Sequence, residues 1–131
     1  MASVLVNAGR AILTNRIKAG GTEPLNIGWG TGAGTAAVAD TTLFTEVATD
    51  VVTTSGSRTA GTSTQQTTSV TNDTYRVTGT RTATGGGTVT NAGLFDNVTI
   101  ASGSLFVKGD FTGIVLLSGD AIAFTFNLQF T

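Results

Sequence analysis

Hydrophobic and polar residues alternate along the last ten positions of the chain. Five apolar residues fall on one face of an extended strand: Ile122, Phe124, Phe126, Leu128 and Phe130. Successive side chains of a β-strand point to opposite faces, so a period of two predicts a strand with one face in a core. We expect Phe124 and Phe126 to be core anchors, with Trp29 packed nearby.

Shorter apolar runs recur along most of the chain and are separated by glycine, serine and aspartate. They predict strands over residues 25–29, 48–54, 63–71, 75–84, 89–95, 105–111 and 114–117. Turn signals that recur at intervals of about 8–12 residues are typical of an antiparallel β-sandwich or a jelly-roll-like domain. The serine- and glycine-rich segment near residues 55–62 predicts a mobile loop, and Gly28–Gly34 predicts a flexible turn rather than a nucleotide-binding loop.

Two segments have helical rather than strand-like spacing. Residues 8–19 follow a plausible N-cap, Asn7, and stop at two glycines, so we expect one N-terminal helix there. Asp40 predicts the cap of a shorter helix over residues 41–47. The whole chain, residues 1–131, is expected to form one mainly β domain in which residues 1–7 are an N-terminal arm and residues 25–131 form the strands.

The composition is poor in charge and rich in threonine. Only 11% of the 131 residues are charged, the net charge is −1, and there are 27 threonines and 18 glycines. Threonine suits the solvent face of a sheet, and a surface with little charge lacks the repulsion that keeps proteins apart. The composition therefore favours a protein that assembles with other chains, with a small independent β domain as the alternative.

The polar inventory argues against several classes of function. The chain has no Cys and no His, so we expect no disulfide, no cofactor and no Cys/His metal site. A charge near zero argues against nucleic acid, and no apolar run approaches the about 18 residues that a membrane span needs. Without His, the only possible replacement for a catalytic Ser–His–Asp triad is a Ser–Lys pair that uses Lys18 or Lys108. The only glutamates that could form a glycosidase pair are Glu23 and Glu46. We therefore expect that the protein is not an enzyme.

Candidate interface residues lie in the first third and the middle of the chain. An apolar run, Val4, Leu5 and Val6, precedes the predicted helix and does not belong to the apolar face of that helix. An exposed apolar run of this kind indicates a contact with a neighbouring protein chain. Deleting residues 1–6 is therefore expected to weaken binding to the assembly while leaving the isolated domain folded. In the middle of the chain, Arg58 is a candidate contact in an exposed-looking loop, although a solvated side chain is the preferred interpretation, and Thr62 and Thr64 belong to a stretch suited to strand pairing.

Several short segments resemble a family of small structural proteins from the virions of tailed bacteriophages, described as head decoration (cement) or tail-fibre-like proteins. These segments are residues 25–32 (LNIGWGTG), 40–43 (DTTL) with Glu46, 92–95 (AGLF), 109–111 (GDF) and 118–126 (SGDAIAFTF). The resemblance implies a non-enzymatic virion protein that is made in the host cytoplasm. A decoration protein would bind the major capsid protein on the outside of the capsid as a homo-oligomer.

Two other functions stay open at this point. The resemblance covers tail components as well as capsid components, so a tail-fibre or baseplate role in host attachment is the main alternative. A small carbohydrate-binding protein or enzyme is the third hypothesis, and no residue of the sequence decides between capsid and tail.

Overall fold

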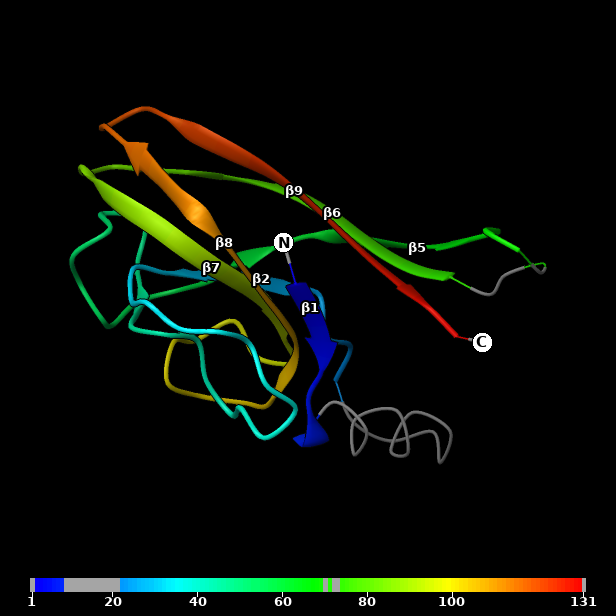
Figure 1. The fold of residues 1–131 in the computed structure, drawn as a ribbon. Coiled ribbons are helices and arrows are strands. Elements are labelled where there is room, and N and C mark those ends of the chain that lie inside the picture. The colour runs from blue at the N-terminus through cyan, green and yellow to red at the C-terminus, as the bar shows by residue number, and fades with distance from the viewer. Residues whose placement is uncertain (1, 9–21, 70, 72–73, 131) are drawn as a thin grey trace.

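The structure is a computed structural model that describes residues 2–8, 22–69, 71 and 74–130, and these residues are mainly antiparallel β (Figure 1). The predicted mainly β class is therefore confirmed. The helix predicted over residues 8–19 lies outside the described residues, apart from Ala8.

The larger sheet has the strand order β1-β8-β7-β2-β3, and β4 also pairs with β2. Its strands are β1 Ala2–Leu5, β2 Asn26–Gly30, β3 Glu46–Val47, β4 Thr59–Ala60, β7 Gly87–Phe95 and β8 Leu105–Leu116. The two apolar runs predicted at 105–111 and 114–117 belong mostly to the single strand β8. Residues 2–5 pair with Val107–Asp110 of this strand, so the predicted N-terminal arm forms an edge of the sheet.

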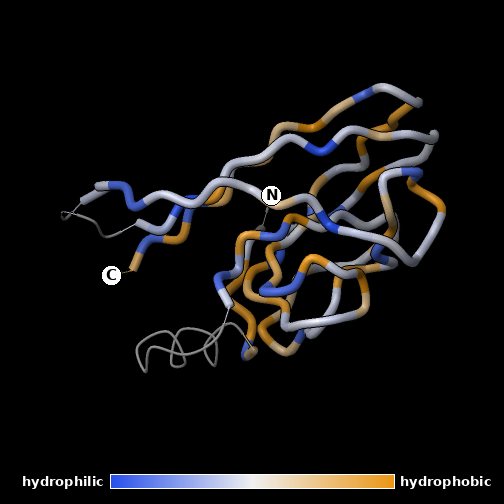
Figure 2. The backbone as a smooth tube through the Cα atoms, turned by 180° about the vertical axis from the view of Figure 1, so that it is seen from behind, coloured by the Kyte–Doolittle hydropathy of each residue, from blue (hydrophilic) through white to orange (hydrophobic). Residues whose placement is uncertain are grey.

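The smaller sheet has the strand order β5-β6-β9. Its strands are β5 Thr62–Gln66, β6 Thr74–Thr82 and β9 Ala121–Gln129. A turn at residues 117–120 carries the chain from the larger sheet into β9, and Gly119 adopts a positive φ of 95° there. In Figures 1 and 2 the far ends of these three strands project beyond the larger sheet, on the side where the C-terminus lies.

The two sheets share one core. Trp29 and Ile27 of the larger sheet are fully buried against Val77 and Phe126 of the smaller one. The indole Nε1 of Trp29 donates to the carbonyl oxygen of Ala48 at 2.9 Å, which satisfies its polar edge. A second cluster contains Val6, Leu43, Phe95 and Leu105.

The alternation in the C-terminal strand is confirmed by its burial. Along β9 the even-numbered residues are buried or half-buried and the odd-numbered residues are exposed. Phe126 is 5% exposed, whereas Phe124 is only half-buried and stacks on Phe126 with a ring separation of 6.0 Å. The anchor at Phe124 is therefore shallower than predicted.

The predicted helix over residues 41–47 is wrong. The chain turns at Phe44 and Thr45, where Thr45 has a φ of 48°, and then enters β3. The side chain of Asn91 accepts a hydrogen bond from the amide of Phe44 at 3.0 Å, and β3 pairs with β2. These long-range partners satisfy the backbone in place of a helix.

The predicted strand over residues 48–54 is also wrong. The carboxylate of Asp50 accepts hydrogen bonds from the amides of Val52 and Thr53, and Val51 has a φ of 63°. Aspartate stabilises turns by this kind of local bond. The side chain of Val51 still reaches the shared core, whereas Val52 beside it is exposed, so one valine of this turn is buried and the other is not.

Candidate functional site

Arg58 is buried, so it is neither the solvated side chain nor the surface contact that the sequence suggested. Its side chain makes a two-pronged ion pair with Glu46, at 2.6 Å from Nε to Oε1 and 2.9 Å from Nη2 to Oε2. Nη1 donates to three carbonyl oxygens, and the guanidinium lies 3.4 Å from the centroid of the Phe95 ring. The carbonyl partners are Asn97, Thr99 and Ser102. Arg58 therefore fastens the 96–104 loop to β3.

Lys108 is the second buried cation. Its Nζ donates to Asp40 Oδ2 at 2.8 Å and to the carbonyl oxygen of Thr42 at 3.0 Å, and it lies over the ring of Phe44. The hydrogen bond from Lys108 lowers the pKa of the Asp40 carboxyl below its ordinary value. The ammonium group thus ties the segment before β3 to β8.

Arg81 is the third buried cation and lies between the two sheets. Its guanidinium donates to the carbonyl oxygens of Ile27 and Val47 and lies 5.0 Å from the Trp29 ring. Burial lowers its pKa to about 10. The group therefore stays protonated at neutral pH, and its carbonyl bonds to both β2 and β3 are retained.

The three buried cations have a structural role. Each one donates to backbone carbonyls or to a carboxylate of the chain itself, so none of them is presented to an outside molecule. In the part of the chain that the structure describes, Arg76 is the one cation that is not buried. It lies on the outer face of the smaller sheet and donates to Asn127 Oδ1 at 2.7 Å.

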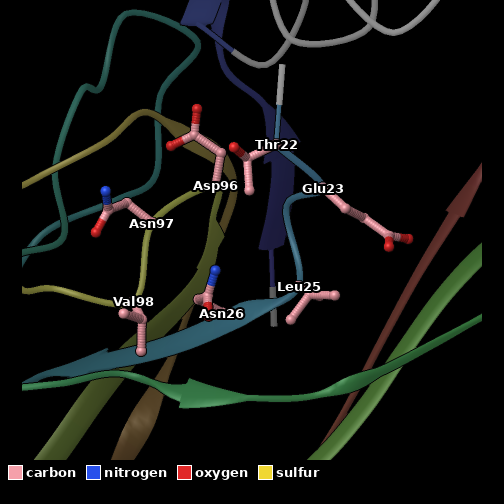
Figure 3. A pocket seen from close by; sticks show the side chains of 7 residues that line it. All are labelled: Thr22, Glu23, Leu25, Asn26, Asp96, Asn97 and Val98. Carbon is pink, nitrogen blue, oxygen red and sulfur yellow. The ribbon is translucent and has the colours of Figure 1, made fainter. Parts of the chain in front are cut away.

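A polar cleft of about 400 Å³ lies beside the start of β2 (Figure 3). It is lined by Thr22, Glu23, Leu25, Asn26, Asp96, Asn97 and Val98. The carboxylate of Glu23 accepts a hydrogen bond from the Tyr75 hydroxyl, and Asp96 Oδ1 accepts one from the amide of Ser104 at 2.6 Å. Figure 3 shows the two carboxylates pointing in different directions, so they do not form the facing pair of a glycosidase.

The outer face of the smaller sheet is the second candidate surface. Thr62, Thr78 and Thr125 stand opposite one another on β5, β6 and β9, and all three are exposed. Thr64 is exposed in the next row. This face therefore presents short hydroxyl side chains in register, with Arg76 as its only charge among the described residues.

The apolar run at the N-terminus is part of the core and not an exposed patch. Val6 is fully buried in the second cluster, Val4 packs against that cluster, and Leu5 packs against the shared core. Strand pairing with β8 turns these side chains inward, which the sequence alone did not indicate. Of the six residues predicted at an interface, only Thr62 and Thr64 are exposed.

Comparisons with protein-family models, with curated proteins and with solved structures give no match. Within the described residues, no cluster of three or more Asp, Glu, His or Cys is placed to hold a metal ion. The search of the same residues for a helix that is long and apolar enough to span a membrane also finds none. The fold and its surfaces define a class only: a mainly antiparallel β protein with buried structural cations and a threonine-rich face.

Proposed function

We propose that this protein is a structural component of a bacteriophage virion, and specifically a decoration protein that binds the outside of the head shell. It would act without catalysis and stabilise the shell through many weak contacts, which gain strength from symmetry and avidity. The sequence segments that resemble small phage virion proteins support this family, and a jelly-roll-like topology stays part of the same proposal.

The observation that carries the proposal is the nearly uncharged outer face of the smaller sheet. Protein interfaces are depleted of charge at their centres, and Thr62, Thr64 and their neighbours offer hydroxyls in a regular array. Because Arg76 is the only charged residue of this face among the described residues, the face offers little electrostatic repulsion against another protein. We assign the shell contact to the β5 side of this face.

A binding assay with particles of the encoding phage tests this assignment. We expect the wild-type chain to sediment with undecorated particles. The Thr62→Lys/Thr64→Lys variant should bind at least about tenfold more weakly, because long, positively charged lysine side chains would replace short threonine side chains at the contact. Thr88→Lys/Thr112→Lys, which adds the same charge to exposed positions of the larger sheet, is the matched control. Equal binding by both variants would contradict the assignment.

The alternative is a tail-fibre or baseplate component that contributes to host attachment. The polar cleft favours it, since Asn26, Asn97 and Asp96 are the kinds of residue that hydrogen-bond sugar hydroxyls. Specific glycan binding by the isolated protein, lost in Asn97→Ala, would support this alternative or the third hypothesis of a carbohydrate-binding protein. Glycan turnover would support a carbohydrate-active enzyme.

A further inference from the structure

Strand β9 is an unprotected edge of the smaller sheet. Among the described residues it pairs only with β6, so its other side presents an open backbone edge along residues 121–128. Natural edge strands are usually guarded by lysine, proline, a bulge or shortness. β9 is nine residues long, pairs with β6 without a register shift, and contains no charged residue and no proline.

The side chains of β9 match those of a second copy of the same strand. Its core-facing side carries Ile122, Phe124 and Leu128, which are half-buried, and Phe130 just beyond the strand is 46% exposed. Its other side carries only alanine, threonine, asparagine and glutamine. Because no residue in the strand is charged, pairing with itself brings no like charges together.

We propose that two copies of this chain associate by antiparallel pairing of their β9 strands, which joins the two smaller sheets into one six-stranded sheet. A two-fold axis perpendicular to the sheet keeps each face on its own side, so apolar residues meet apolar residues and threonines meet polar residues. The proposal supplies the contact for the homo-oligomer and rests on that part of the proposed function.

Strand β9 is a better edge than β5 for this contact. β5 has five residues and is polar on both sides, so pairing there would bury no apolar side chain. In Figures 1 and 2 the far half of β9 projects beyond the larger sheet. In the dimer, the second copy would bury apolar side chains near this edge that stay partly exposed in a single copy.

Sedimentation velocity of the purified full chain, without particles, tests the proposal over about 1–500 μM. We expect a concentration-dependent dimer in the wild type. Thr125→Lys/Asn127→Lys should weaken the dimer at least tenfold, because the two copies together would place four lysines along the paired β9 strands. Thr78→Lys/Thr80→Lys adds the same charge to the same face on the central strand and should leave the dimer unchanged. Circular dichroism and thermal melting check that both variants fold.

A cysteine scan locates the joint independently, because the natural chain contains no cysteine. Single cysteines are placed at each position from Ala121 to Asn127 and oxidised mildly. Equivalent residues lie within disulfide reach, with Cα atoms less than about 7 Å apart, only next to a two-fold axis. We therefore expect dimer crosslinking to peak at one or two neighbouring positions, with none for Thr78→Cys.

Three results would overturn the proposal: a wild-type chain that stays monomeric, a dimer that survives the β9 lysines, or crosslinking without a peak in β9. Because no particle is present, such a failure would leave the particle-binding result of the proposed function untouched.

Discussion

At the scale of single residues, the buried cations are the least expected feature of this protein. Arg58 follows a serine- and glycine-rich segment, and nothing nearby in sequence suggests that it is buried. Its partners come from Glu46 and from the distant loop at residues 97–102. Such contacts depend on the tertiary arrangement, so local pattern predicted an exposed side chain. Threonine exposure at positions 62 and 64, by contrast, followed from composition alone.

Removing Arg58 should strongly destabilise the fold. Arg58→Ala leaves the Glu46 carboxylate, whose side chain is 9% exposed, and three carbonyl oxygens without their donor. Breaking one partner of a buried pair costs about 3–5 kcal/mol of unfolding free energy. Urea denaturation measures the loss. Arg76→Ala, which removes one exposed bond, is the control and should cost less than about 1 kcal/mol. Similar losses in both variants would contradict the structural role of Arg58.

The Asp40–Lys108 ion pair should make stability depend on pH. The folded-state pKa of Asp40 is lowered from 3.8 by the hydrogen bond from Lys108, so its contribution is present above about pH 3.8 and is lost as the pH falls through the lower folded value. We expect the difference in unfolding free energy between wild type and Asp40→Asn to shrink below about pH 3.8. Denaturant titrations from pH 2.5 to 6 measure it, and a difference that does not change with pH would refute the linkage.

At the scale of elements, periodicity located the long strands and failed in the compact turns. β6, β7 and β9 were predicted within one to two residues; β9 alternates over all nine positions, whereas β7 ends in a continuous buried run. The segments at 41–47 and 48–54 were mistaken for a helix and a strand, because Leu43, Val47 and Val51 are buried although they lie in irregular backbone or, for Val47, in the two-residue strand β3. Spacing of apolar residues reports burial, and it identifies an element only where the backbone is regular over several residues.

The two faces of β9 should respond very differently to truncation. Phe126→Ala opens a cavity in the shared core and should lower the unfolding free energy by about 3–5 kcal/mol. Thr125→Ala, on the exposed face of the same strand, should change it by less than about 0.5 kcal/mol. Thermal melting of the two variants compares them directly. If Phe126→Ala left the melting temperature unchanged, the face assignment would be wrong.

Deletion of residues 1–6 should destabilise the domain, contrary to what the sequence suggested. The deletion removes β1 and the fully buried Val6, and it uncovers Leu105 in the second cluster. We expect a clearly lower melting temperature and an earlier urea midpoint than in the full chain. A truncated protein that melts like the wild type would show that β1 contributes nothing to stability.

At the scale of the whole molecule, one observation links the core to the proposed role. Three of the four cations in the described residues are buried, while the smaller sheet presents hydroxyls on one face and an unguarded edge at β9. The low charge of the sequence predicted a protein that contacts other chains, but it did not predict which surfaces are available. Strand pairing in the structure supplies that answer, because it hides residues 4–6 and exposes the smaller sheet.

Imaging of the intact phage particle by electron cryomicroscopy tests the decoration role most directly. The account predicts density of this fold at many symmetry-related positions on the outer surface of the head, with the smaller sheet against the shell. Density confined to a few copies in the tail or baseplate, or a head surface without this protein, would contradict it.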